Sequence, residues 1–400
     1  MNEHHGRFYI QYSIAIVIMK IGILTQPLHS NYGGLLQAWA LQKSLTDMGH
    51  EVTIINRIPG KINIPLWRKF ALNIKENLLI VLNKRKRYLP VTPELKEYSE
   101  SQVIPFRKNR YTGISPEIKS NEEFLSYINN TCFDAFVVGS DQVWRPMYSP
   151  NLMTYFLDFA KDNTTVKKIA YAASFGVDSW ELSKSDTEKA KVLAPQFDLI
   201  TVRESSGVNL VKEHLNCQAF HVLDPTMLRS KEDYLNLIKE PTLPLNESNG
   251  DLFCYVLDNS EPIKEIISNC SLQTGYRPYY CNYKTHVSQL TKKNQISDSI
   301  VPPVEQWLKS FADAKMVITD SFHGTVFSIL FNKPFWVVSN SERGSARFAS
   351  LLTEFGLSNR MIKNTVEIDW TQNIDWDEIN KHLEMRQKES TDLLLNALKS

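Results

Sequence analysis

Residues 316–338, MVITDSFHGTVFSILFNKPFWVV, constrain the fold of this chain more than any other segment. An apolar run, MVIT, stops at Asp320-Ser321, a helix-patterned stretch starts at His323-Gly324, and a second apolar run, FWVV, closes the unit. This order predicts a strand, a turn, a helix and a second strand. The polar residues then lie where a strand ends and a helix begins, which is where open α/β sheets bind ligands and where anions are favoured.

Short β-rich runs alternate with helix-patterned stretches along most of the chain. Strands separated by helices predict parallel βαβ units, and continuous apolar runs are typical of strands covered on both faces. The sequence therefore predicts an α/β fold. The candidate strands are KIGILT (20–25), EVTIIN (51–56), AFVVGS (135–140), KIAYAAS (168–174), LITVRE (199–204), DLFCYVL (251–257), RPYYCNY (277–283), MVITD (316–320) and FWVV (335–338).

The length of 400 residues exceeds what one compact core accommodates, so we expect two domains. The first α/β domain is predicted over residues 19–215, and residues 57–130 break its rhythm as a variable helical insertion. The second is predicted over residues 216–368. Charged helices are expected to end the chain over residues 369–400.

The first 18 residues contain a weak apolar stretch that is too short to span a bilayer and lacks a clear small-residue cleavage site. We interpret residues 1–18 as an extension outside the core, with Met19 as the natural start. Since no export signal is recognised, the cytoplasm is the expected location.

Charge and cysteine content exclude several classes of function. Forty-five basic and 44 acidic residues nearly cancel, which gives no argument for nucleic-acid binding. Five cysteines include no CxxC pair, which argues against a disulfide framework or a zinc site. The glycine turn at residues 31–34 is not GxGxxG, and the second strand ends at Asn56 rather than at an acid, so a nicotinamide cofactor is not indicated.

Residues 70–88, FALNIKENLLIVLNKRKRY, resemble a basic amphipathic helix. One interpretation is peripheral contact with the inner membrane face or with a lipid-linked acceptor. The alternative, which we favour, is a helix packed on the core with a solvated basic end.

The strand-to-helix turn at 320–324 is the leading candidate site. His323 and Asp320 are candidate catalytic residues, and Ser321 and Gly324 stand beside them at the helix start. Two basic residues follow the next strand, Arg343 and Arg347, four apart and on one face if their segment is helical. Together these residues predict a site for an anionic ligand.

Other strand ends carry further candidates. Asn31-Tyr32-Gly33-Gly34 lets backbone N–H groups approach a ligand, although a simple tight turn has the same pattern. Asp141 follows the AFVV strand and either caps a helix or accepts a hydrogen bond from a sugar hydroxyl. Trp144 offers a face for a sugar ring or belongs to the core. Arg203 ends the LITV strand, where it binds a carboxylate or phosphate, or forms an ion pair.

At these residues the sequence resembles the polysaccharide pyruvyl transferase family. The matching pieces are KIGILT with NYGGLLQAWAL, FVVGSDQVW, TVRESSG, VLDPTML and VITDSFHGTVFSILFNKPFWVV, in order from about residue 20 to residue 360. The resemblance implies two Rossmann-like domains that face each other across a cleft, as in GT-B glycosyltransferases. It implies transfer of the enolpyruvyl group of phosphoenolpyruvate to sugar hydroxyls in surface polysaccharide biosynthesis, with no further cofactor and no metal.

The resemblance also implies roles for the candidate residues. Protonated His323 is the expected acid, and Asp320 either orients it or accepts the hydroxyl proton. The donor is expected to contact Arg203, Ser321, Gly324, Arg343 and Arg347. The acceptor, a nucleotide-linked, lipid-linked or polymeric sugar, is expected to contact Asn31, Tyr32, Gly33, Gly34, Asp141 and Trp144.

One position departs from the family pattern. Well-studied members resemble Arg-x-His at the turn, whereas this chain has Ser321-Phe322-His323. Because a hydroxyl cannot replace a guanidinium bidentately, Arg343 or Arg347 must supply the charge, or the donor differs. A nucleotide-sugar glycosyltransferase and a non-catalytic protein that binds glycan or a partner are the alternative functions.

Overall fold

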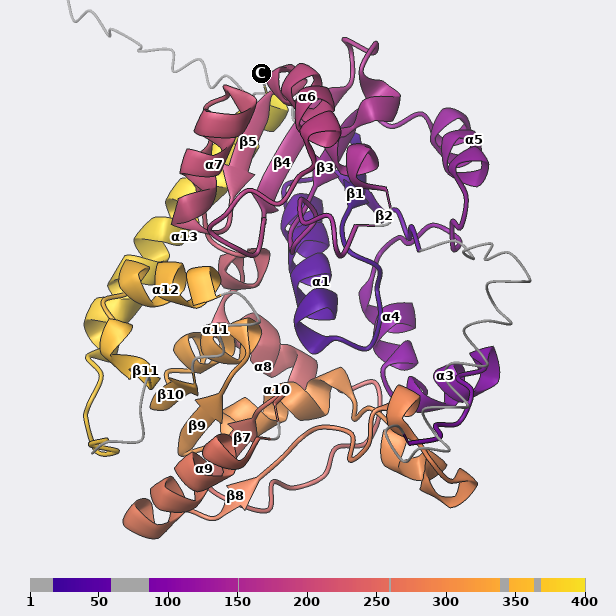
Figure 1. The fold of residues 1–400 in the computed structure, drawn as a ribbon. Coiled ribbons are helices and arrows are strands. Elements are labelled where there is room, and N and C mark those ends of the chain that lie inside the picture. Colours follow the sequence, from indigo (N-terminus) through magenta and orange to yellow (C-terminus); the bar gives the residue numbers. More distant parts are fainter. Residues whose placement is uncertain are drawn as a thin grey trace, which may run out of the picture.

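The chain folds into two parallel sheets that lie in separate halves of the molecule, with helices α1, α11 and α12 between them (Figure 1). A computed structural model describes residues 17–58, 86–149, 151–258, 260–338, 345–362 and 368–399. The first sheet has six strands in the order β2-β1-β3-β4-β5-β6, and the second has five in the order β11-β10-β9-β7-β8. Every pairing between these strands is parallel, which confirms the predicted α/β fold with two Rossmann-like halves.

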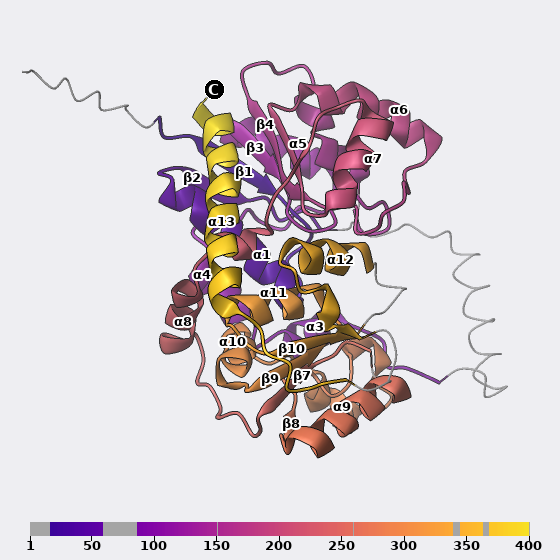
Figure 2. The ribbon, with the colours of Figure 1, turned by 90° about the vertical axis from the view of Figure 1, so that its left-hand side faces the viewer.

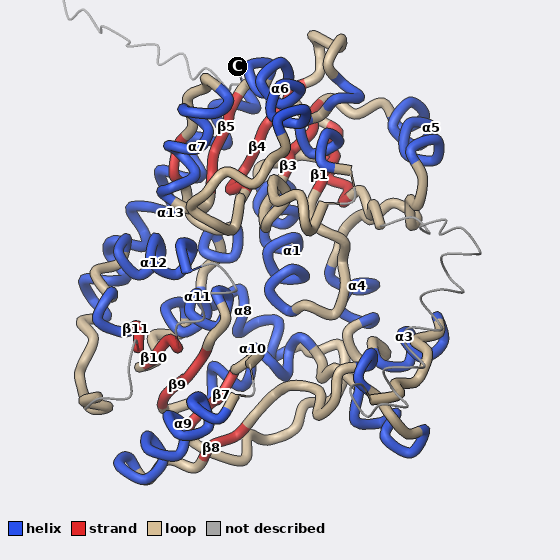
Figure 3. Tube along the Cα trace, viewed as in Figure 1, coloured by secondary structure: helices blue, strands red, loops and turns tan. Residues whose placement is uncertain are grey.

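The first half mostly alternates strands and helices in chain order, and the described residues between β2 and β3 form three short helices (Figure 3). Its elements are β1 (Lys20–Leu24), α1 (Tyr32–Asp47), β2 (Glu51–Ile54), α3 (Pro93–Ser99), α4 (Ile104–Arg110), α5 (Asn121–Thr131), β3 (Ala135–Val138), β4 (Lys167–Ala173), α6 (Lys184–Leu193), β5 (Leu199–Val202), α7 (Ser205–Leu215) and β6 (Phe220–His221).

The second half repeats the alternation around a smaller sheet and ends in a long helix. Its elements are α8 (Lys231–Lys239), β7 (Leu252–Tyr255), α9 (Glu261–Thr274), β8 (Pro278–Tyr279), α10 (Val304–Asp313), β9 (Met316–Thr319), α11 (Phe322–Leu330), β10 (Phe335–Val338), α12 (Ser345–Glu354), β11 (Met361–Ile362) and α13 (Trp376–Lys399).

The central strands are buried along their whole length, as their continuous apolar sequences predict. AFVV of β3, LITV of β5 and MVIT of β9 contain only buried residues. A parallel sheet with helices on both faces hides both sides of each strand, so alternation of polar and apolar residues is lost. These strands form the frame that holds the turns at their carboxyl ends.

Three details of the second half differ from the sequence prediction. β6 pairs with β5, so the predicted boundary between residues 215 and 216 falls inside the first sheet. The run RPYYCNY contributes only two residues to its strand, Pro278–Tyr279. A two-residue strand, β11, follows α12 and extends the sheet beyond β10. It was not predicted, because no apolar run marks it in the sequence.

The C-terminal segment forms one long helix, α13, that runs alongside both halves (Figure 2). It attaches to the polypeptide that links the two sheets. The Ser390 hydroxyl accepts the N–H of Leu223 at 3.2 Å, the Gln387 amide donates to the carbonyl of Met227 at 2.7 Å, and Arg386 donates to the carbonyl of His221 at 2.9 Å. The helix therefore fastens the linker.

Some predicted features lie outside the described residues. They include residues 1–16 of the N-terminal extension, residues 70–85 of the basic amphipathic segment, and Arg343. Membrane contact through residues 70–88 stays a prediction. In the part of the chain that is described, no helix is long and apolar enough to cross a bilayer.

Candidate functional site

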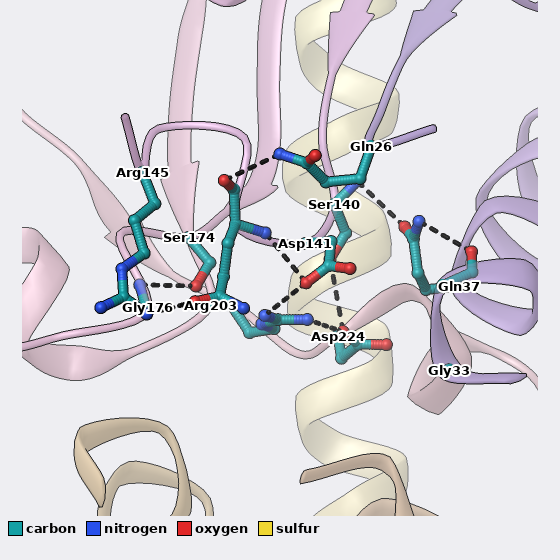
Figure 4. A network of polar contacts seen from close by, with 12 residues as sticks. Gln26, Gly33, Gln37, Ser140, Asp141, Arg145, Ser174, Gly176, Arg203 and Asp224 are labelled. Carbon is teal, nitrogen blue, oxygen red and sulfur yellow. Dashed lines mark hydrogen bonds and ion pairs between the residues drawn. The ribbon is translucent and has the colours of Figure 1, made fainter. Parts of the chain in front are cut away.

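Polar residues from the strand ends of both sheets meet between the two halves. Asp141 follows β3, Arg203 follows β5 and Asp224 follows β6 in the first half, while His323 lies in the first turn of α11, after β9 of the second half. Figure 4 shows the part of this network that belongs to the first half. Carboxyl ends of parallel strands collect at one edge of a sheet, so the two edges face each other here.

His323 approaches a carboxylate from the opposite half of the molecule. Its Nε2 lies 3.6 Å from Oδ2 of Asp224, an ion-pair distance rather than a hydrogen bond. The His323 side chain is 9% exposed and that of Asp224 is fully buried. The ring therefore has a fixed acidic neighbour in a water-poor site.

Asp224 is held in the ionised form by its surroundings. Its Oδ2 accepts a hydrogen bond from Arg203 Nη1 at 2.9 Å and one from the Ser140 hydroxyl at 3.3 Å, and its Oδ1 accepts one from the Thr226 hydroxyl at 2.6 Å. Burial by itself raises the pKa of Asp224, but the close approach and charge of His323, with the charge of Arg203, outweigh it and hold that pKa well below its usual value. A carboxylate with these partners stays charged.

Arg203 links Asp224 to a second acid. Its Nη2 lies 3.3 Å from Oδ1 of Asp141, and its guanidinium lies 4.6 Å from the ring centroid of Phe322 on α11. Burial lowers the pKa of Arg203, but Asp224 and Asp141 raise it overall. The Arg203 side chain is only 1% exposed and pairs with Asp224 and Asp141 in the described state. Its predicted contact with the donor therefore requires these ion pairs to break.

Arg347 of α12 brings a second guanidinium to the same place. It lies 5.7 Å from the ring centroid of Phe322, the ring that also contacts Arg203. Burial and the like charge of Arg203 lower the pKa of the Arg347 guanidinium to about 10. A bound anion would offset the like charge of Arg203, so this position suits a carboxylate or phosphate.

The glycine turn at the start of α1 packs directly on the catalytic candidate. A Cβ at Gly33 would lie 2.0 Å from Nδ1 of His323, so only glycine fits there. Asn31 caps α1, with its side-chain oxygen accepting the N–H groups of Gly33 and Gly34 at 3.1 and 3.4 Å. Gly33 is thus a contact for His323 in this state, rather than a free ligand surface.

In the turn after β9, the predicted site residues Asp320, Ser321 and Gly324 make structural contacts. Both carboxylate oxygens of Asp320 accept backbone N–H groups, from Leu257 at 2.7 Å and Asp258 at 2.9 Å. The predicted orientation of His323 by Asp320 is therefore corrected, because the acid beside the imidazole is Asp224. The Ser321 hydroxyl caps α11 by accepting the N–H of Gly324, and a Cβ at Gly324 would lie 2.1 Å from the Thr319 hydroxyl oxygen.

Two predicted acceptor contacts belong to the core instead. Trp144 is 0% exposed, stacks on Phe156 at 5.0 Å and donates its indole N–H to the carbonyl of Tyr155 at 2.9 Å. Tyr32 stacks on Trp307 at 5.3 Å and donates its hydroxyl to the carbonyl of Pro302 at 3.0 Å, so it joins the two halves. Neither ring is available to a sugar in this state.

Comparison with known proteins decides the family. The model of the polysaccharide pyruvyl transferase family matches residues 31–342, most of the 400-residue chain. The chain belongs to the polysaccharide pyruvyl transferase family. It matches no curated protein.

Solved structures similar to this family member include two UDP-N-acetylglucosamine 2-epimerases. The enzyme from Rickettsia bellii is 10% identical, with 96% of this chain and 98% of that chain covered and a TM-score of 0.49. The enzyme from Neisseria meningitidis, solved with UDP-GlcNAc, is also 10% identical, with coverages of 95% and 99% and a TM-score of 0.48.

Two acids of this pyruvyl transferase family member escaped the sequence prediction as site residues. Asp224 lies in VLDPTML, and its position after an apolar run was the available signal. Glu204 is fully buried, and its Oε1 accepts the N–H groups of Phe175 and Gly176 and the hydroxyl of Ser174. Glu204 thereby fixes the turn after β4 beside Arg203.

The predicted acceptor residues Asn31, Gly34 and Asp141 do line a common pocket. It opens beside the start of α1 and has a volume of about 430 Å³. Within the described residues, no group of three or more His, Cys, Asp or Glu side chains is placed to hold a metal ion.

Proposed function

We propose that this protein transfers the enolpyruvyl group of phosphoenolpyruvate to sugar hydroxyls, forming a pyruvate ketal and releasing phosphate. The observation that carries the proposal is the buried His323–Asp224 pair, at 3.6 Å, with Arg203 and Arg347 beside it. An acid for carbon protonation and cations for an anion with a carboxylate and a phosphate then lie in one place.

The donor would use Arg347 for its charged groups, since the family Arg position is Ser321 here and its hydroxyl caps α11. His323 is 7% exposed, and its two ring nitrogens face Asp224 and Gly33 of the first half. Donor binding therefore requires the halves to move apart at this boundary, which would separate Arg203 from Phe322 and leave its ion pairs with Asp141 and Asp224 within the first half.

The chemistry balances without another reactant. Protonated His323 gives a proton to the methylene carbon of phosphoenolpyruvate, which becomes a methyl group and leaves an electrophilic carbon. One sugar hydroxyl oxygen bonds to that carbon and loses its proton, which restores His323. A second hydroxyl oxygen of the same sugar then displaces phosphate, which leaves with the second proton. The Asp224 carboxylate gives the imidazolium form of His323 a charge partner.

Release of inorganic phosphate from phosphoenolpyruvate tests the proposal. The full-length protein is incubated with phosphoenolpyruvate and a panel of nucleotide-linked and lipid-linked sugars, and the product is examined by mass for the added pyruvyl group. Acceptor-dependent phosphate release is expected. Release of a nucleoside diphosphate from a nucleotide sugar, with no phosphate from phosphoenolpyruvate, would show a glycosyltransferase instead.

A further inference from the structure

The 430 Å³ pocket beside α1 has the size of a small-molecule site, within the usual range of roughly 300–1,000 Å³. Gly34 lines this pocket, whereas the neighbouring Gly33 packs on the imidazole of His323. Its walls come from the first half: Gln26, Pro27, His29, Asn31, Gly34, Asp141, Gln142, Met147 and Tyr148.

The residues that line this pocket include few charged side chains. It contains neither lysine nor arginine, and its one acid is Asp141. Burial and the charge of Lys96 lower the pKa of His29, which favours the neutral ring. Gln26 and Asn31 add neutral amides. A diphosphate would meet no cation in this pocket and one carboxylate, so a neutral ligand fits it better.

Tyr148 supplies an aromatic wall. The residue is 46% exposed, a large value for an aromatic residue. Arg145 lies 5.3 Å from its ring centroid and is fixed by Glu181 at 2.9 and 3.2 Å and by the Gln142 side chain at 3.1 Å. Arg145 therefore helps to fix the orientation of the Tyr148 ring, and much of the ring stays accessible to a ligand.

Asp141 joins the pocket to the catalytic network through one oxygen. Its Oδ1 lies 3.3 Å from Arg203 Nη2 and accepts the N–H of Gln142 at 2.9 Å. Its Oδ2 makes no hydrogen bond to the described part of the chain. An ionised carboxylate is an acceptor only, so this oxygen is free to bind a hydroxyl donor.

We propose that this pocket binds the acceptor as a neutral pyranose ring, with its C–H face on Tyr148 and a hydroxyl on Oδ2 of Asp141. Identifying the bound sugar as the acceptor rests on the proposed pyruvyl transfer. Binding of a sugar in this pocket does not depend on that function. The charged carrier of the sugar, nucleotide or lipid-linked, then lies outside this pocket.

Ligand-observed NMR on the full-length protein tests the assignment directly. The probes are neutral methyl glycosides of galactose, glucose and mannose, with UDP as the anionic comparison. At least one glycoside is expected to bind, with strongest saturation transfer to its ring C–H protons. Tyr148→Ala is expected to weaken that binding at least tenfold, whereas Tyr148→Phe keeps it. Tyr98→Ala is the matched control, because Tyr98 is also 46% exposed and does not line this pocket.

Three results would overturn the inference: no glycoside binds, Tyr148→Ala binds as tightly as the parent protein, or UDP competes with the glycoside for the Tyr148-dependent site. The phosphate-release assay separates this outcome from the fate of the proposed function. Tyr148-dependent glycoside binding without phosphate release leaves the sugar pocket standing and removes pyruvyl transfer. Phosphate release with no change in acceptor KM for Tyr148→Ala places the acceptor elsewhere.

Discussion

Asp224, which follows the last strand of the first sheet, lies 3.6 Å from the imidazole of His323, which follows a strand of the second sheet. The two halves of the molecule thus contribute one side chain each to the central ion pair. Any movement that separates the two halves also separates His323 from Asp224. The distance between the halves therefore determines whether His323 has an acidic neighbour.

Replacing His323 by Asn is expected to lower phosphate release from phosphoenolpyruvate by about 10²–10⁴-fold, because the general acid is lost. The thermal midpoint should change little relative to that loss. His382→Gln is the matched control, since His382 also contacts a carboxylate, Glu354, at 2.8 Å, but lies on α13. Equal loss in both variants would contradict a catalytic role for His323.

Asp224→Asn is expected to reduce phosphate release while leaving substrate affinity closer to that of the parent protein. The amide keeps the shape of the side chain but removes the charge beside His323 and Arg203. A shift of the pH–rate profile would indicate that Asp224 acts on the imidazole. An unchanged profile with lower thermal stability would indicate a structural role only.

The depressed pKa of Asp224 predicts a stability loss in acid. Below the usual Asp pKa of 3.8, the unfolded state takes up a proton that the folded state refuses. The stabilisation is therefore complete above pH 3.8 and declines as the pH falls towards the folded-state pKa. Denaturant titrations across acidic pH should show a shallower decline for Asp224→Asn, and an equally steep one would refute the linkage.

Gly33→Ala is expected to disrupt the site, because the added methyl carbon would lie 2.0 Å from Nδ1 of His323. The substitution should lower both the thermal midpoint and phosphate release. At Gly34 the nearest atom to an added Cβ is 3.7 Å away, so Gly34→Ala should keep the parent midpoint or raise it slightly through better helix propensity. Matching midpoints for the two variants would show that Gly33 is not packed on His323.

Asp320→Asn is expected to destabilise the fold, rather than to abolish catalysis selectively. Each carboxylate oxygen accepts one backbone N–H, from Leu257 and Asp258, and the amide can replace only one of them. The unsatisfied N–H should cost about 1–3 kcal/mol of unfolding free energy, measured by urea denaturation. A stable variant with no phosphate release would restore Asp320 as a catalytic candidate.

Local patterns predicted much of the fold and part of the site. The apolar runs of β1, β3, β5 and β9 are fully or almost fully buried strands, because strand formation depends on residues that are neighbours in sequence. The placement of His323 at a strand-to-helix turn was likewise local information. The very short strands β8 and β11 left only a weak signal.

The partners of the candidate residues depended on contacts between distant segments. Whether Trp144 faced a sugar or the core was decided by its packing on Phe156, and Tyr32 joined the halves because α10 presents Trp307 to it. Arg203 could be assigned to an ion pair only after Asp141 and Asp224 had been brought beside it.

The sequence by itself determined that the chain is α/β, that it belongs with the pyruvyl transferases, and that His323 stands where a sheet binds anions. Only the tertiary structure decided which acid faces His323. Asp320 is three residues away, yet its carboxylate serves two backbone N–H groups, whereas Asp224 arrives from the other half. A turn fixes where a side chain begins, but its partner is set by how the two halves of the molecule pack against each other.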